Sequence, residues 1–173
     1  NKGGEKMDYK IIEVPQFKVA GKSKSFDFSS FIKEGRKFWK DYVGSSDYQK
    51  LYSLSGGRPG TITGAPLLSV YSPKPKEDGK EDEFVDMLGL EASSESEFKE
   101  FELQKVPSAT YAEFNCTYKT SMKTNRYIYG EWFSSTGFER DGIKPDIVAY
   151  FPVPFRPMNE MLVRWWIPII AER

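Results

Sequence analysis

The sequence contains no histidine, and Cys116 is the one cysteine among its 173 residues. The absence of histidine excludes Ser-His-Asp and Cys-His catalysis, histidine metal sites and imidazole pH switches. A single thiol cannot form an intramolecular disulfide, a zinc ribbon or an iron–sulfur cluster. We therefore expect no metal and no cofactor, and we interpret Cys116 as an inert buried thiol on a strand.

Long apolar runs and an excess of one charge are also absent. The longest apolar run, from Trp165 to Ala171, has the length of a strand and contains Pro168; a membrane helix needs roughly 20 apolar residues. Lys and Arg number 25, and Asp and Glu number 25, so the formal net charge is zero. Nucleic-acid-binding proteins usually carry a basic excess. We expect no direct contact with nucleic acid or membrane, and one thiol without a secretory signal favours the cytoplasm.

Aromatic residues are abundant, at 16% of the chain, which is enough to fill a core, line a pocket or do both. The first half shows a strand pattern, a helical pattern and two further strand patterns. These predict strands over 8–20, 65–72 and 84–92, and a helix over 29–43. Asp27 or Ser29 can cap this helix, and Gly44 stands where a C′ glycine is expected. A polar, glycine-rich stretch continues to about residue 64, a charged loop spans 73–83, and a polar connector spans 93–97.

The same order of elements recurs in the second half of the chain. The predicted elements are a strand over 99–118, a helix over 121–136, and strands over 146–153 and 161–169. Pro15 and Pro107 bend the first strand of each half. We predict one α+β domain over 1–173, formed by pseudo-twofold duplication of a β-α-β-β unit, with repeat one over about 8–92 and repeat two over about 99–170. Such a domain has an antiparallel sheet, two main helices and, between the repeats, a cleft that suits a ligand.

Five segments, taken in order, carry a resemblance to a known family. They are YKIIEVPQFKVAGKS (9–23), FWKDY (38–42), YAEFNCTYK (111–119), GEWFSSTGFE (130–139) and VRWWIPI (163–169). Together they resemble the effector-binding domain of AraC-type and MerR-type regulators, also called the GyrI-like small-molecule-binding domain. The resemblance implies two β-α-β-β units and a cleft for lipophilic, often cationic molecules. Because the sequence begins at the first strand, it implies a stand-alone effector-binding or multidrug-binding protein of transcription regulation, without a DNA-binding domain.

The family resemblance also implies a buried carboxylate in the last strand, where this sequence has Arg164. Three explanations remain open. Another acid replaces the missing one, with Glu131, Asp86 and Glu91 as candidates; or the pocket selects neutral or anionic ligands through Arg164; or the strand is shifted by one residue and Arg164 faces water. We interpret Asp86 as part of an exposed strand face.

Several aromatic and charged side chains are candidates for ligand contact. Trp166 shares the strand parity of Arg164, so we place it in the cleft and Trp165 in the core. Tyr71 and Tyr150 occupy matching places in the two central strands. The predicted ligand-binding residues are Trp39, Tyr71, Glu131, Trp132, Tyr150, Arg164 and Trp166. Core packing remains the alternative for the rings, and a solvated helix position remains the alternative for Glu131.

Binding of a lipophilic small molecule, charged or neutral, is the function that these features favour. One alternative is a hydrolase of reactive lipophilic compounds, in which Glu131 acts with Tyr71 or Tyr150. Another is a protein-interaction module of the gyrase-inhibitor type, with a protein partner or a second copy as its target. Edge strands in such a fold could pair between chains.

Overall fold

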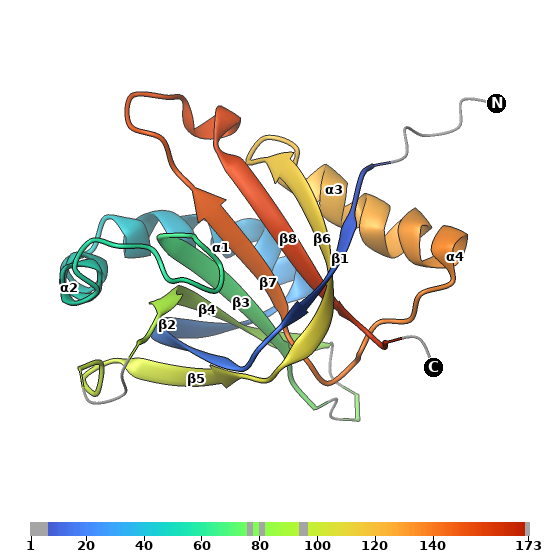
Figure 1. The fold of residues 1–173 in the computed structure, drawn as a ribbon, viewed down its shortest axis with the longest axis horizontal. Coiled ribbons are helices and arrows are strands. Elements are labelled where there is room, and N and C mark those ends of the chain that lie inside the picture. The colour runs from blue at the N-terminus through green and yellow to red at the C-terminus, as the bar shows by residue number, and fades with distance from the viewer. Residues whose placement is uncertain (1–6, 76–77, 80–81, 94–96, 172–173) are drawn as a thin grey trace.

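An antiparallel sheet of eight strands, in the order β1-β6-β8-β7-β3-β4-β2-β5, organises the chain (Figure 1). The computed structural model describes residues 7–75, 78–79, 82–93 and 97–171, so the predicted charged loop and polar connector lie partly outside the described residues. The strands are β1 (Lys10–Val14), β2 (Phe17–Asp27), β3 (Leu67–Pro73), β4 (Glu83–Glu91), β5 (Glu102–Val106), β6 (Ala109–Thr117), β7 (Asp146–Phe151) and β8 (Leu162–Ile169). The α+β class and the antiparallel sheet are confirmed, and each of the strands predicted over 8–20 and 99–118 is divided into two.

The strand order shows the duplication directly. Exchanging β1 to β4 with β5 to β8 turns the order of the sheet into its own reverse. The axis of this pseudo-twofold passes between β3 and β7, where Ser69 pairs with Val148. The register then makes Tyr71 and Tyr150 equivalent, since Tyr71 pairs with Asp146 and Tyr150 pairs with Leu67. The matching places predicted for the two tyrosines are therefore confirmed.

The two prolines that bend the first strand of each half let the halves exchange strands. Pro15 separates β1 from β2, and Pro107 separates β5 from β6. β1 pairs with β6 of the other half, and β5 pairs with β2 of the first half. Because proline has no N–H to donate to a ladder, each break falls where the chain changes its partner. The first strand was predicted to end at residue 20, whereas β2 continues to Asp27.

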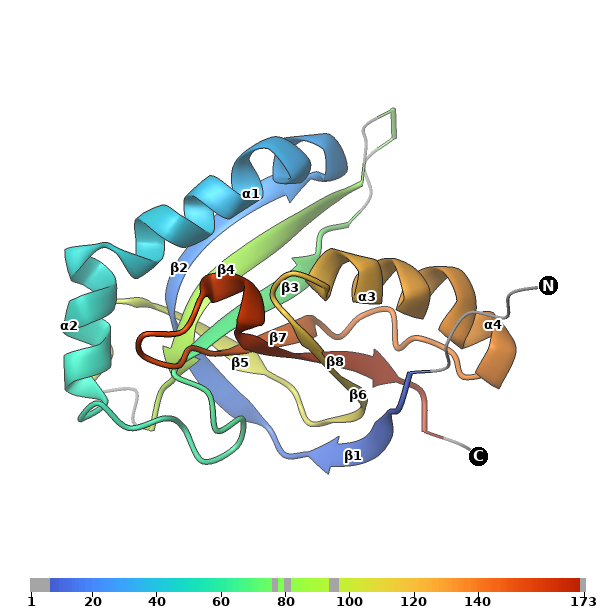
Figure 2. The same ribbon diagram turned by 90° about the horizontal axis from the view of Figure 1, so that it is seen from above.

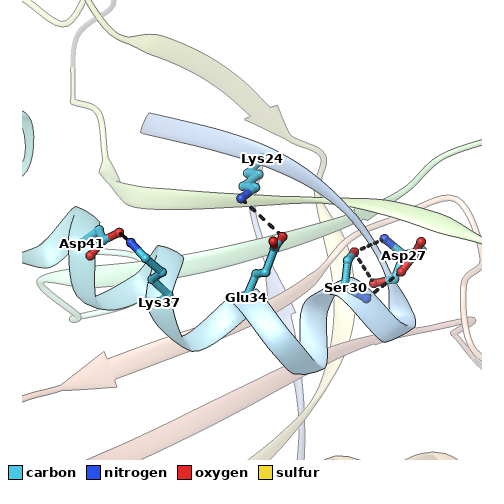
Figure 3. A network of polar contacts seen from close by, with 6 residues as sticks. All are labelled: Lys24, Asp27, Ser30, Glu34, Lys37 and Asp41. Atoms are coloured by element: carbon cyan, nitrogen blue, oxygen red, sulfur yellow. Dashed lines mark hydrogen bonds and ion pairs between the residues drawn. The ribbon is translucent and has the colours of Figure 1, made fainter.

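The first half carries two helices, α1 (Phe28–Val43) and α2 (Ser46–Leu54). Asp27 caps α1, since its carboxylate accepts from the Ser30 backbone N–H at 2.7 Å, and Lys24 on β2 lies 3.7 Å from Glu34 (Figure 3). Gly44 follows α1 with a right-handed φ of −83°, so it is not the predicted left-handed C′ glycine. α2 falls in the stretch interpreted as a loop, because most of its residues are polar and glycines follow it.

The helix of the second half contains a π-helical turn. It consists of α3 (Ser121–Tyr127), the π turn η1 (Ile128–Trp132) and α4 (Phe133–Thr136), and Gly137 ends it with a φ of +80°. A π turn adds one residue to a helical turn, so later side chains are rotated away from the face that an α-helical period predicts. α1 and α3 lie on the same side of the sheet (Figure 2). No helix in the described ranges has the length and apolar character of a membrane span.

Two glycines let β2 and β4 approach closely, which leads to a first testable expectation. Gly21 and Gly89 are paired, and a Cβ added at Gly89 would lie 1.9 Å from the carbonyl oxygen of Ala20. Neither backbone can move without breaking the ladder. Gly89→Ala is therefore expected to lower the free energy of unfolding by roughly 1–3 kcal/mol, and the melting temperature by roughly 2–12 °C.

Calorimetry of Gly89→Ala beside Gly130→Ala measures this effect. A Cβ at Gly130 meets nothing within 4 Å, and alanine favours a helix. The Gly130→Ala variant should therefore melt at or above the wild-type temperature. An unchanged melting temperature for Gly89→Ala would contradict the close approach of the two strands.

Candidate functional site

A cavity of about 1120 Å³ lies between α1, α3 and the central strands. α1 lines one wall at helical spacing, with Phe28, Phe31, Ile32, Gly35, Arg36 and Trp39. α3 and its π turn line the facing wall with Ser121, Met122, Asn125, Arg126, Tyr129 and Gly130. The floor comes from side chains on one face of the sheet, namely Ser69, Tyr71, Asp86, Asp146, Tyr150 and Trp165. The cavity therefore spans the two halves, as the duplication predicted.

Aromatic rings form a continuous surface at the α1 side of the cavity. The Tyr71 ring stacks on Trp165 with centroids 6.2 Å apart and an interplanar angle of 19°. Phe31 meets Tyr71 edge-on at 5.8 Å and meets Phe84 at 5.3 Å. Such edge and offset contacts hold rings rigidly in place. A flat or globular apolar ligand therefore meets ordered ring faces.

A second group of rings surrounds the floor hydroxyls. The Trp39 ring lies 5.5 Å from Tyr150 and 5.8 Å from Tyr118. The Tyr150 hydroxyl lies 3.2 Å from the Ser69 hydroxyl. Burial raises the pKa of Tyr150 and of Tyr71 well above the usual value, so both phenols stay neutral. They offer hydrogen bonds and ring surface to a ligand, and no charge.

Asp86 places a carboxyl group on the floor of the cavity. Its residue is 2% exposed, and its Oδ1 has no hydrogen-bond partner among the described residues. Burial raises the pKa of Asp86 to about 8, and the Ser69 hydroxyl acts in the opposite direction. Lys24 stands opposite Asp86 in the β2–β4 register, and its Nζ lies 3.7 Å from Glu34. No basic side chain among the described residues forms an ion pair with Asp86, so a positive group on a ligand would stabilise its ionised form.

A second acid, Asp146, differs from Asp86 because it already has a counter-charge. Arg140 Nη2 donates to Asp146 Oδ1 at 2.8 Å, and the Tyr129 hydroxyl donates to Oδ2. Burial raises the pKa of Asp146, and the Arg140 charge opposes that rise. Arg140 also donates to the Lys144 carbonyl at 2.9 Å, which holds the turn before β7. In the described part of the chain, no group of three histidine, cysteine or acidic side chains could hold a metal ion.

Three of the residues predicted to bind ligand line this cavity, namely Trp39, Tyr71 and Tyr150. They come from α1, β3 and β7, and the structure brings their side chains together around the floor. Contact between these residues and a ligand stays a prediction. The four other predicted residues lie elsewhere.

Trp166 and Arg164 point to the face of the sheet away from the cavity. Trp166 Nε1 donates to Glu113 Oε1 at 3.0 Å, and Arg164 Nε donates to Asn115 Oδ1 at 3.0 Å. Trp165, which was predicted in the core, is a buried core residue and also lines the cavity. The placement of Trp166 and Arg164 was wrong because adjacent strand residues point to opposite faces, and a shift of one residue reverses both.

Trp132 and Glu131 were also predicted to face the cleft. Trp132 is 1% exposed and packs at 5.1 Å against Phe114 and at 5.4 Å against Phe138, behind the helix. An α-helical period would place it beside Tyr129, but the π turn rotates it into the core. Glu131 is exposed and does not line the cavity. A hydrolase that uses Glu131 would therefore lack its acid at this site.

The interpretation of Asp86 as part of an exposed strand face is wrong. Its signal in the sequence was an acid between two apolar neighbours, which is unusual on a strand that is buried on both faces. Glu91, the third acid considered, serves the fold, because it accepts backbone N–H groups of Ile62 at 2.9 Å and Thr63 at 3.0 Å. The other residues missed, Phe31, Phe84, Asp146 and Arg140, carry no local signal that separates pocket from core.

A family model of the GyrI-like small molecule binding domain matches residues 7–170. The chain belongs to this family. Membership makes this GyrI-like chain a small-molecule-binding domain, and the cavity between its halves is the site that the structure offers. No curated protein sequence matches significantly.

Solved structures share the fold of this GyrI-like chain. One is SAV2435 bound to tetraphenylphosphonium, with a TM-score of 0.75, 11% identity and 95% of each chain covered. Another is the EcmrR C-terminal domain, with a TM-score of 0.56, 18% identity, and 96% of this chain and 99% of that chain covered. A third is a hydrolase from Listeria innocua, with a TM-score of 0.54, 13% identity, and 96% and 94% covered. At such identities the likeness shows the fold alone.

Proposed function

We propose that this GyrI-like domain binds lipophilic organic cations and acts as an effector-binding protein. The observation that carries the proposal is Asp86, a buried carboxyl whose Oδ1 has no partner in the described residues, on the floor of an aromatic cavity. Ring faces attract cations. A cation whose charge is spread over a large apolar body also costs less to desolvate than a compact ammonium.

The rings supply most of the affinity in this proposal. Trp39, Tyr71 and Tyr150 contribute ring surface, and Trp165 and Phe31 extend it. Apolar surface removed from water contributes roughly 25 cal/mol per Å². Asp86 then selects the sign of the ligand charge. The SAV2435 structure, which has the same fold and holds tetraphenylphosphonium, supports this ligand class.

A pair of ligands with one shape and opposite charges tests the proposal. Tetraphenylphosphonium at 100 times its Kd should stabilise the domain by about 2.7 kcal/mol, which raises the melting temperature by roughly 5–10 °C. Tetraphenylborate, the matched anion, should give a much smaller shift. Equal shifts would contradict selection by charge.

Cation affinity should rise with pH up to the pKa of Asp86. Below about 8, the carboxyl is protonated in the free domain, and binding a cation must first release that proton. The apparent Kd should therefore fall about tenfold between pH 6 and 7, less steeply from pH 7 to 8, and then level off. Tetraphenylphosphonium does not titrate, so calorimetry in two buffers of different ionisation enthalpy should detect the released proton at pH 6.5. A Kd that is flat from pH 6 to 8 would contradict this role for Asp86.

A further inference from the structure

The outer part of the cavity carries three basic side chains. Arg36 comes from α1, Lys119 from the turn before α3, and Arg126 from α3; all three residues are exposed and line the cavity. None of them has an ion-pair partner within the residues that the structure describes. We call these three residues the basic rim. Their positive charge is therefore available to a bound molecule.

Helical spacing aims two members of the basic rim at the cavity. Arg36 follows Ile32 by four residues, and Arg126 follows Met122 by four, and all of these side chains line the cavity. Residues four apart on a helix share one face. The Arg36 guanidinium also lies over the Tyr118 ring, 5.9 Å from its centroid, which directs it along the cavity wall.

A backbone hydrogen bond holds Lys119 next to the connection between β7 and β8, which forms a further side of the cavity mouth. Its N–H donates to the Asn159 carbonyl at 3.2 Å, and Asn159 itself lines the cavity. Asn125 on α3 adds a second amide to this wall. The side of the cavity formed by α3 and the β7–β8 connection is therefore polar and basic, whereas the α1 side is largely aromatic.

The acidic side chains thus lie on the floor of the cavity, and the basic rim lies nearer its mouth. Asp86 lies buried on the floor, Asp146 is paired with Arg140, and the unpaired charges nearer solvent are all positive among the described residues that line the cavity. The equivalent of Asp86 in the second half is Val163, since Tyr71 pairs with Asp86 and Tyr150 pairs with Val163. A simple cation complements the floor but meets repulsion from the basic rim. A molecule that carries a positive and a negative charge can complement both Asp86 on the floor and the basic rim.

We propose that the preferred ligand is amphoteric: a large aromatic cation that bears a carboxylate, with the cation against Asp86 and the carboxylate at Arg36, Lys119 and Arg126. This inference rests on the proposed function and deepens it by adding an anionic group to the ligand. Guanidinium groups suit a carboxylate because they present parallel N–H donors. Asp86 lacks a counter-charge among the described residues, whereas Asp146 is paired with Arg140, so Asp86 fixes the orientation of such a ligand with its cation innermost.

Two dyes that differ by one ester test the inference. Tetramethylrhodamine with its free carboxylate and tetramethylrhodamine methyl ester share the same cationic ring system, and fluorescence anisotropy gives both Kd values. The wild-type domain should bind the free acid roughly tenfold more tightly than the ester, because the carboxylate gains weak, solvent-exposed ion pairs with the basic rim that the ester cannot form. The preference should shrink as salt is added.

A triple variant and a matched control separate the basic rim from general charge. In Arg36→Gln/Lys119→Gln/Arg126→Gln, the ratio of the two Kd values should fall close to one. In Lys33→Gln/Lys40→Gln/Lys123→Gln, which removes the same charge from exposed positions outside the cavity lining, the ratio should stay near the wild-type value. Thermal melts of both variants show that each is folded.

The outcomes distinguish this inference from the proposed function. A wild-type preference for the ester, or a ratio that the rim variant leaves unchanged, would overturn the inference. Asp86→Asn should weaken both dyes by a similar factor. If Asp86→Asn weakens neither dye while the rim variant still abolishes the ratio, the cation site fails and the carboxylate contact stands. If neither dye binds the wild-type domain, both proposals are overturned.

Discussion

Asp86→Asn is expected to weaken tetraphenylphosphonium binding by at least about thirtyfold, since losing one partner of a buried charge pair costs about 2–5 kcal/mol. Asparagine keeps the shape of the side chain and fits among the same rings, so the apolar contacts of the ligand remain. The loss therefore reports the charge of Asp86 alone. The affinity of the variant should also be independent of pH, because the titrating group has been removed.

The same substitution should make the ligand-free domain more stable at alkaline pH. The pKa of Asp86 is about 8 in the folded state and 3.8 as a model value. Between these values the folded state binds the additional proton, so the wild-type free energy of unfolding decreases as pH rises. The Asp86→Asn variant has no such dependence, so the difference in melting temperature should grow between pH 5 and 8.5.

Asp41→Asn, at an exposed position of α1, is the control for the binding experiment and should leave tetraphenylphosphonium binding unchanged. An Asp86→Asn variant that binds tetraphenylphosphonium with wild-type affinity would contradict the proposed function.

Arg140→Met should produce the largest loss of stability. It leaves Asp146, which is 9% exposed, without its counter-charge. Breaking a buried ion pair costs about 3–5 kcal/mol, which corresponds to roughly 6–20 °C in melting temperature. The loss should be greatest near pH 8 and smaller near pH 5. Burial already raises the pKa of Asp146, and at lower pH the unpaired carboxyl can take up a proton, which removes the cost of burying its charge.

A double variant separates the charge effect from the loss of packing. Arg140→Met/Asp146→Asn removes both charges, and it should recover a large part of the stability that Arg140→Met loses. Arg156→Met, at an exposed position in the connection between β7 and β8, is the matched control and should melt like the wild type. If Arg140→Met alone melts like Arg156→Met, the pair with Asp146 is not holding the turn before β7.

Sequence patterns predicted the elements that follow a regular period. The strand and helix sequence of both halves, the bends at Pro15 and Pro107, and the equivalence of Tyr71 and Tyr150 all depend on local alternation or on internal repetition. These features are visible in one chain because they repeat within it. α2 was missed because its polar residues and the glycines after it resemble a loop.

The errors at the site have a different physical origin. In β8, both Trp165 and Trp166 are large and apolar, so composition does not reveal which one faces the cavity; the register with β7 decides it. Trp132 was misplaced because a π turn has no signature in hydrophobic period. Asp86 was misjudged because a buried, unpaired acid is unfavourable for folding alone, and sites for charged ligands accept that cost.

The exchange of β1 and β5 between the halves bears on how the chain reaches its fold. β1 is completed only when β6, about a hundred residues later, has been made, and β5 must return to β2. Pairings between such distant segments give a high contact order, which slows folding. Each half also lacks an edge strand until the other is present, so neither repeat has a finished sheet on its own. Opening of the domain should then be cooperative, with the cavity lost in the same step as the sheet rather than melting ahead of it.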